Sequence, residues 1–259
     1  MELDLLTLGL LALAALLAGF IDAIAGGGGL ITVPALLATG MPPTMALATN
    51  KLQGCFGSFS ASVYYFRRGL IDWRNMKWAV VCTFVGSVLG TLLVQYIDAS
   101  VLEKVLPFLL AVFALYFLFS PRIGDEDRQR RLGIIPFALL VGTGVGFYDG
   151  FFGPGAGSFF ALGFIALAGY SMGKATAHTK VLNFTSNIAS LLFFILGGQV
   201  VWVAGLAMAG GQFLGARLGS KMVVTKGTRI IRPMLVTVSL IMSVRLLWQQ
   251  YPQWFSWIS

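Results

Sequence analysis

The chain has 259 residues, of which 57% are hydrophobic and only 11% are charged, and its mean hydropathy is +0.84. This leaves too little polar surface to coat a soluble globule of that size, so the composition excludes a water-soluble domain and predicts an integral membrane protein. The net charge of +8 does not indicate nucleic-acid binding, because the basic residues lie in short loops between apolar runs rather than in one stripe.

Apolar runs long enough for the roughly 20 residues of a bilayer crossing occur along the whole chain. They predict an all-α, polytopic membrane protein with about 8 to 10 membrane segments. The first run follows two acidic residues and has no basic region or cleavage site, so we expect it to be a retained span. The predicted spans are residues 5–25, 44–66, 78–97, 105–119, 134–152, 176–197, 200–218 and 231–248.

Two glycine-rich segments interrupt this pattern, Gly26–Gly29 near the start and Gly153–Gly157 past the middle. Each follows an apolar run and an aspartate, Asp22 in the first case and Asp149 in the second. Broken helices at matching places in two halves are typical of transporter binding sites. The glycine segments therefore predict two broken helices and a site between them.

The similarity between the halves continues beyond the glycines. Ala-Thr-Asn-Lys at residues 48–51 aligns with Ala-His-Thr-Lys at residues 177–180, and the same offset pairs Gly69 with Gly198 and Trp73 with Trp202. We therefore expect one transmembrane transporter domain, residues 1–259, made of repeat one (1–120), a charged linker (121–133) and repeat two (134–259).

Two short apolar pieces, residues 30–39 and 158–168, follow the glycine segments and can cross only about half of a ~30 Å hydrocarbon core. We interpret them as half-helices, and whether they cross the membrane is left open. Counting them as crossings makes the two repeats inverted and puts the basic clusters on one face. These clusters are Arg67, Arg68, Arg74 and Lys77, the linker, and Lys221, Lys226, Arg229 and Arg232.

The positive-inside rule makes that face cytoplasmic. The linker 121–133 is then cytoplasmic, and both termini are periplasmic or extracellular. Cys55 and Cys82 lie inside apolar stretches without a partner at metal-ligand spacing, so we expect no metal site, disulfide or cofactor.

Glycine clusters free backbone N–H groups and permit positive φ, so they predict an anion-binding concavity at the start of each half-helix. Close helix packing or a hinge is the alternative. Lys51 and Lys180 occupy matching positions in apolar runs, where a charge costs roughly 2.5 to 3.5 kcal/mol and indicates a functional site unless the side chain snorkels to the headgroups. The predicted substrate-binding residues are Gly26, Gly27, Gly28, Gly29, Asn50, Lys51, Gly153, Gly155, Gly157, Thr179, Lys180, Asn183 and Asn187.

Three further ionisable residues lie close to these in sequence. Asp22 and Asp149 either carry protons during transport or cap the broken helices and pair with the lysines. His178 is the only histidine of the chain, and its ordinary pKa of about 6.5 suits proton coupling, whereas a structural hydrogen bond is the alternative. These three residues are candidates for coupling or for structure.

At these residues the chain resembles the TauE/SafE family, also called the toluene sulfonate uptake permease family. The resemblance rests on the segment Gly26–Pro34, its counterpart Gly153–Gly157, and the two Lys-containing segments that follow them, in the same order in both halves. It implies a bacterial inner-membrane protein that moves a sulfur-containing or carboxylated organic anion, with sulfite or organosulfonate export as the best-known activity of the family. It also implies no nucleotide hydrolysis and no cofactor.

The expected function is secondary export of a small anion, sulfite or sulfonate, with the proton as a candidate coupling ion. A passive anion channel and an accessory subunit of a larger permease are the alternatives. An enzyme is not expected, because the sequence contains no nucleophile and base pair, metal-ligand cluster or histidine-rich motif. The expected partners are the anion and the lipid bilayer but no nucleic acid, and a homo-oligomer is left open.

Overall fold

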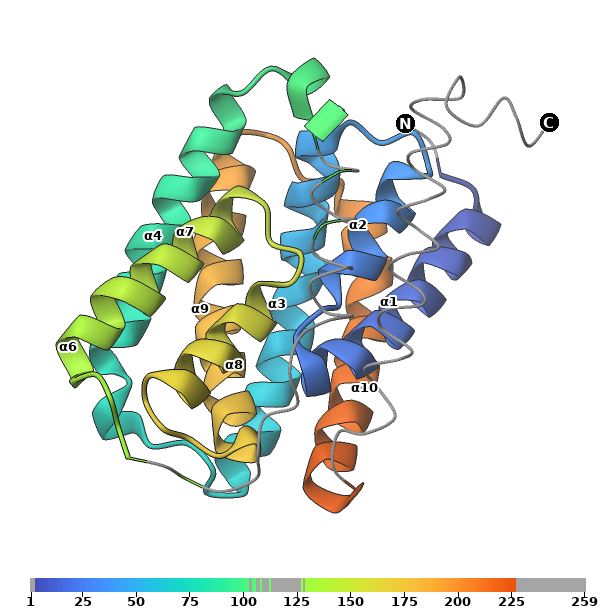
Figure 1. Cartoon of the computed structure of the whole chain (residues 1–259). Helices are drawn as coiled ribbons and strands as arrows, with labels where there is room; N and C mark the ends of the chain where they lie inside the picture. The colour runs from blue at the N-terminus through green and yellow to red at the C-terminus, as the bar shows by residue number, and fades with distance from the viewer. Residues whose placement is uncertain are drawn as a thin grey trace, which may run out of the picture.

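The computed structural model describes residues 3–102 and 129–226, together with residues 104, 105, 108, 112 and 127. These residues form a helical bundle without strands, which confirms the predicted all-α class (Figure 1). The elements are α1 (Leu5–Ala25), α2 (Gly29–Leu37), α3 (Pro43–Arg67), η1 (Trp73–Asn75), α4 (Lys77–Tyr96), α6 (Ile134–Phe137), η2 (Ala138–Thr143), α7 (Gly144–Phe151), α8 (Ala156–Ala166), α9 (Met172–Leu196) and α10 (Trp202–Lys226).

Four stretches among the described residues are long and apolar enough to cross a membrane, namely α1, α4, α9 and the continuous helix Ile134–Phe151. This last helix contains η2, a six-residue π-helical stretch. Helices α3 and α10 are equally long, at 25 residues each, but carry more polar residues. The predicted spans 105–119 and 231–248 lie outside the continuously described part of the chain.

The two short apolar pieces are short helices. Helix α2 has 9 residues and α8 has 11, which at 1.5 Å per residue gives lengths of about 14 and 17 Å. Each therefore covers only about half of a hydrocarbon core. In Figure 1 the two helices run in opposite directions from the centre of the bundle.

The glycines end and start helices where left-handed backbone is required. Gly26 caps the C-terminus of α1 at φ +77°, and its N–H donates to the carbonyl of Asp22. In the second half Gly153 has φ +95° and Gly155, the N-cap of α8, has φ +85°. Such angles cost other residues free energy, which accounts for glycine here. The helix breaks themselves are residues 26–28 and 152–155, so Gly29 and Gly157 already belong to α2 and α8.

The first helix of each half packs against the last described helix of the other half. Helix α1 lies along α10, and the Ile134–Phe151 helix lies along α4. Glycine rows let the backbones touch: a Cβ on Gly215 would lie 2.0 Å from the Leu16 carbonyl oxygen, and one on Gly90 would lie 2.1 Å from that of Phe147. Close approach through small residues replaces hydrophobic driving force between helices in lipid.

Helices α3 and α9 cross the centre of the bundle antiparallel to each other (Figure 1). Two hydrogen bonds fix this arrangement. Beyond the end of α9 the Val201 N–H donates to Thr49 Oγ1 near the start of α3 at 3.1 Å, and beyond the end of α3 the Asp72 N–H donates to His178 Nε2 near the start of α9 at 3.0 Å. Thr49 and His178 occupy matching positions in the two halves, and so do Asp72 and Val201. The two halves therefore exchange equivalent contacts.

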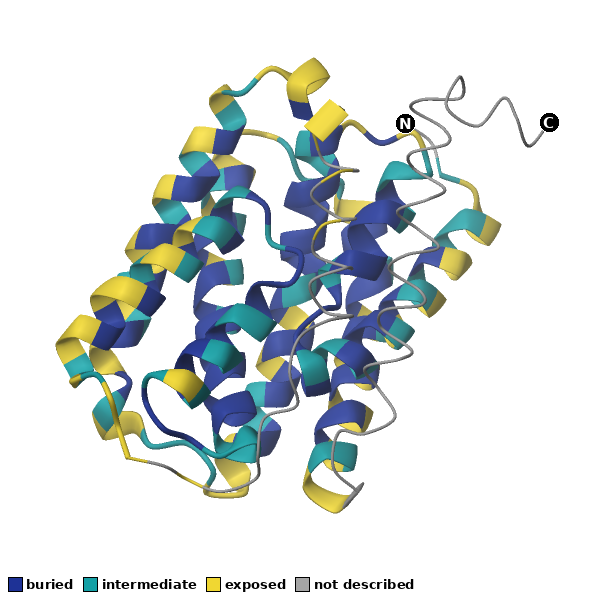
Figure 2. Ribbon diagram, viewed as in Figure 1, coloured by how far each residue is buried: buried dark blue, intermediate teal, exposed yellow. Residues whose placement is uncertain are grey.

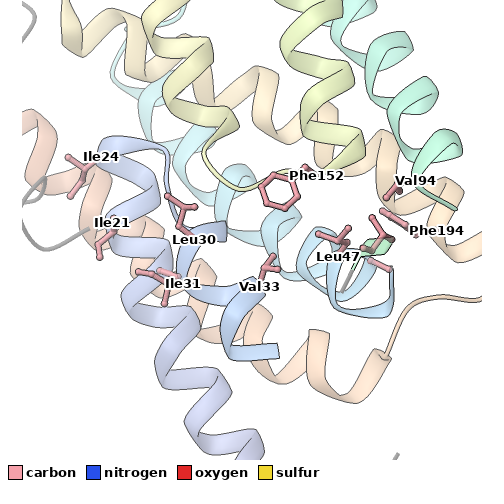
Figure 3. Close-up of a cluster of buried hydrophobic side chains, with 12 residues drawn as sticks. Ile21, Ile24, Leu30, Ile31, Val33, Leu47, Val94, Phe152 and Phe194 are labelled. Carbon is pink, nitrogen blue, oxygen red and sulfur yellow. The ribbon is translucent and has the colours of Figure 1, made fainter. Parts of the chain in front are cut away.

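Burial follows the expectation for a bundle in lipid. In Figure 2 the buried residues face the interior and the exposed ones line the outside of the bundle. Large apolar side chains remain exposed on the outer helices, among them Leu10 and Leu13 of α1 and Val85 and Leu89 of α4. Such surface would be costly in water and suits a bilayer. Beside the breaks an apolar cluster contains Ile21 and Ile24 of α1, Leu30, Ile31 and Val33 of α2, Leu47 of α3, and Val94, Phe152 and Phe194 (Figure 3).

Candidate functional site

A cavity of about 40 Å³ lies between the two helix breaks, α3, α9 and α10. A single water molecule needs roughly 10–15 Å³ by the same measure, so the cavity has room for about three waters or a small solute. Its lining is polar and contains no aromatic side chain. The lining residues are Asp22, Gly26, Gly29, Asn50, Gln53, Gly54, Asp149, Gly153, Gly155, Ala156, Gly157, Asn183, Asn187 and Gln212.

The two breaks contact each other at the cavity. A Cβ on Gly26 would lie 2.5 Å from the carbonyl carbon of Gly157, and one on Gly29 would lie 3.0 Å from Cα of Pro154. The Ser158 hydroxyl also donates to the Ala25 carbonyl oxygen. The first break therefore meets the second at backbone contact distance, and the paired glycine segments lie together in the fold.

Both half-helices begin at this crossing. The first residue of α2, Gly29, and the first residues of α8, Ala156 and Gly157, line the cavity. A helix N-terminus presents free N–H groups and the positive end of the helix dipole. Two such ends converging on one polar cavity favour a negatively charged ligand, an arrangement also found in transporters with discontinuous helices.

The first lysine of the predicted site forms a buried ion pair with the other half of the chain. Lys51 Nζ lies 2.6 Å from Asp149 Oδ1, and the two side chains are only 2% and 6% exposed. The same ammonium donates to the main-chain carbonyl oxygen of Asp149, near the C-terminus of α7. A cation at a helix C-terminus is favourable, so Lys51 stabilises the broken end of α7 as well as the carboxylate.

The second lysine makes the equivalent ion pair, with Lys180 in the second half and its aspartate in the first. Lys180 Nζ lies 2.9 Å from Asp22 Oδ2 and donates also to the Asp22 carbonyl oxygen, near the end of α1. The other carboxylate oxygen, Oδ1, accepts a hydrogen bond of 3.1 Å from the Gly28 N–H. Taken as whole residues, both lysines are 1% exposed, which rules out snorkelling to the headgroups. Each aspartate therefore pairs with a lysine of the other half, and Asp22 also accepts the N–H of Gly28 at the start of α2.

Side-chain amides make up much of the remaining lining. The Asn50 carbonyl oxygen accepts from Thr32 Oγ1 at 2.6 Å and from Gln53 Nε2 at 2.7 Å. The side-chain oxygens of Gln53, Asn183 and Gln212 are buried without a hydrogen-bond partner. Since a carboxamide can turn over and present either its oxygen or its NH₂ group, these groups can provide donors to a ligand in the cavity.

The structure brings most of the predicted site together. Gly26, Gly29, Asn50, Gly153, Gly155, Gly157, Asn183 and Asn187 line the cavity, as do Asp22 and Asp149. Lys51, Lys180 and Thr179 are buried behind this lining, and Gly27 and Gly28 lie in the first break without lining the cavity.

Four lining residues were not predicted: Gln53, Gly54, Ala156 and Gln212. Helical spacing could have revealed the first two, because Asn50, Gln53 and Gly54 follow an i, i+3, i+4 pattern on one face of α3. Gln212 is a buried amide between the closely packed glycines of α10.

His178 lies outside the cavity. Its Nε2 accepts from the Asp72 N–H, and its Nδ1 lies 2.7 Å from the Lys174 carbonyl oxygen, so both ring nitrogens are engaged. Nδ1 must carry the proton, because it faces an acceptor, while Nε2 faces a donor. His178 therefore connects α9 to the loop after α3. Thr49 makes the equivalent hydrogen bond in the other half, between α3 and the connection after α9.

Comparison with known proteins identifies the family of this chain. The sequence model of the family described as sulfite exporter TauE/SafE matches residues 11–246. A probable membrane transporter protein of Escherichia coli K12, YfcA, is 58% identical over 248 residues, or 96% of this chain and 92% of the relative. A probable membrane transporter protein of Haemophilus influenzae is 52% identical over 255 residues, covering 98% and 99%. The YdhB protein of Bacillus subtilis, also named a probable membrane transporter, is 26% identical over 212 residues, covering 81% and 86%. The chain thus belongs to the sulfite exporter TauE/SafE family and is a membrane transporter.

Proposed function

We propose that this protein is a secondary transporter of a small oxyanion of the sulfite or sulfonate class, and that the cavity between the helix breaks is its binding site. The observation that carries the proposal is the convergence of two half-helix N-termini on one polar cavity. The size of about 40 Å³, the mostly polar lining and the lack of aromatic side chains among the lining residues favour a compact solute over an aryl sulfonate or a long dicarboxylate.

We further propose that the two halves are inverted repeats that rock against each other to open the cavity to either side in turn. This is supported by the antiparallel course of α3 and α9, the opposite directions of α2 and α8, and the exchange of equivalent hydrogen bonds between the halves. Such an exchange is what a twofold axis in the membrane plane would produce.

The positions of the basic residues predict how the protein is oriented in the membrane. The connection from α3 to α4, with Arg67, Arg68 and Arg74, lies at the same end of the bundle as the start of α6 and the end of α10 (Figure 1). By the positive-inside rule we propose that this end faces the cytoplasm of a bacterial inner membrane. A membrane-impermeant maleimide is expected to label Ser100→Cys from the periplasm but not Arg74→Cys, both exposed positions, in a background where Cys55 and Cys82 are alanine. The reverse labelling would overturn the orientation.

Counterflow in proteoliposomes tests the transport function directly. Vesicles loaded with unlabelled sulfite, sulfate or methanesulfonate and diluted into a trace of the labelled anion should accumulate the label transiently. With valinomycin and equal potassium on both sides holding the membrane potential at zero, a carrier exchanges one molecule for another and gives this overshoot, whereas a channel dissipates the gradient without it. Protein that gives no counterflow with any of the three anions would contradict the proposal.

Gln212→Met tests the cavity assignment. The substitution removes an amide donor from the cavity and should lower counterflow by about tenfold. It should leave the unfolding temperature unchanged or higher, because the side-chain oxygen of Gln212 is buried without a hydrogen-bond partner. The matched control is Gln199→Met in the connection between α9 and α10, which lies outside the cavity. Equal counterflow in both variants would place the anion elsewhere.

A further inference from the structure

The ionisable groups around the cavity add up to no net charge. Two lysines face two aspartates, and each is engaged in an ion pair between the halves. Both aspartates line the cavity, and both lysines lie behind them. Among the residues that line the cavity in the described part of the chain, no cation stands without a counterion.

This balance creates a difficulty for any anion that enters. A negative charge in a buried site of zero net charge has no ionic counterion, so the two helix N-termini alone must offset its loss of hydration. The anion could take a lysine from its aspartate, but the carboxylate would then be the unpaired buried charge. One added proton on the carboxylate resolves both problems, because it neutralises the aspartate and frees the ammonium for the anion.

The two ion pairs are not equally accessible. The Asp22 side chain is 18% exposed, against 6% for that of Asp149, and its pair is the longer one at 2.9 Å against 2.6 Å. Protonation of Asp22 on Oδ2 leaves Oδ1 free to keep the hydrogen bond from the Gly28 N–H. The helix cap then survives while the lysine is released, so Asp22 is the carboxylate that can take a proton in this conformation.

The other groups around Asp22 do not compete for this role. From α3 the Tyr65 hydroxyl donates to the Ala23 carbonyl oxygen, and from α9 the ammonium of Lys180 forms the pair itself. The pair of Asp149 with Lys51 lies across the cavity. Helices α2 and α8 contain no ionisable residue. On α10, Gln212 lines the cavity, whereas the charged residues Arg217 and Lys221 are exposed.

We propose, resting on the transport function above, that Asp22 binds one proton each time a monovalent anion binds, and that Lys180 then serves as the counterion of that anion. The proton comes from solvent and adds to Oδ2, and Lys180 remains an ammonium ion hydrogen-bonded to the Asp22 carbonyl oxygen. Proton and anion cross together, so transport of a monovalent anion is electroneutral. It responds to a pH gradient and not to the membrane potential.

The test compares wild type with Asp22→Asn in proteoliposomes, using whichever of sulfite, sulfate or methanesulfonate gives counterflow. An acidic outside should make wild type accumulate the anion, up to about tenfold per unit of pH gradient at equilibrium. Asp22→Asn imitates the protonated residue and keeps the acceptor for Gly28, so we expect measurable counterflow without accumulation driven by the gradient. Comparing the two proteins with one anion at one pH cancels the protonation of the anion itself.

Two further measurements keep the proposal falsifiable. Asp149→Asn, whatever its absolute rate, should retain the response to the pH gradient. If it alone loses the response, or if Asp22→Asn keeps it, the assignment to Asp22 is overturned. With wild type alone, a pH dye inside the vesicles should report one proton per methanesulfonate or other monovalent anion, and a potassium diffusion potential should leave uptake unchanged. Uptake that follows the membrane potential and ignores the pH gradient overturns proton coupling but leaves the proposed anion transport intact. Absence of counterflow with all three anions refutes the proposed anion transport itself.

Discussion

Lys51→Met is expected to lower the free energy of unfolding by about 3–5 kcal/mol, the loss typical of removing one partner from a buried ion pair. The Asp149 side chain is only 6% exposed, and its Oδ1 lies 2.6 Å from the lysine. Without the ammonium, this carboxylate is an unpaired charge inside the bundle, and the carbonyl at the end of α7 loses its donor. Denaturant or thermal unfolding of the purified protein in detergent measures the loss.

Two matched variants separate charge from packing in this prediction. Lys51→Met/Asp149→Asn removes both charges and should recover most of the stability, because neutral replacement of a whole buried pair is often without cost. Lys180→Met should cost less than Lys51→Met, because Asp22 is more exposed and keeps the N–H of Gly28. Equal losses for the two single variants, or no recovery in the double variant, would mean that the pairs do not stabilise the fold in this way.

Much of the helical architecture was predictable from apolar run lengths. The predicted span 5–25 coincides with α1, and 44–66 and 176–197 lie within a few residues of α3 and α9. Apolar runs mark helices well in a membrane because the backbone can satisfy its hydrogen bonds only within a helix. The π-helical stretch η2 was not predictable, since Pro136 before it and Gly142 within it lie in an apolar run that has the length of one continuous span.

Most residues of the candidate site were predictable from the sequence, but the ion pairs between them were not. The matched positions of Lys51 and Lys180 follow from the predicted repeat, and both lysines are buried in the bundle rather than extended to its surface. That each lysine pairs with the aspartate of the other half could not follow from spacing, because it depends on how α3 and α9 lie against the broken helices. In the folded chain both lysines are neutralised by aspartates, which is one of the two roles that the sequence leaves open for Asp22 and Asp149.

Gly26→Ala is expected to abolish counterflow and to destabilise the protein by several kcal/mol, because two separate costs coincide at this residue. The first is conformational: its φ of +77° is left-handed, which costs a residue with a Cβ about 1–2 kcal/mol. The second is steric: the new Cβ would lie 2.5 Å from the carbonyl carbon and 2.8 Å from Cα of Gly157 in the other half. Neither contact can be relieved by turning a side chain, so the two breaks must move apart.

Gly40→Ala provides a matched control for this prediction. Gly40 has φ +81°, nearly the same as Gly26, but a Cβ there would meet no atom within 4 Å. It should therefore show only the conformational cost of about 1–2 kcal/mol and keep its counterflow. The difference between the two variants, measured by unfolding and by transport of the same anion, isolates the contact between the breaks. If Gly26→Ala loses no more stability than Gly40→Ala and still transports, backbone contact between the two breaks is not what holds the binding site together.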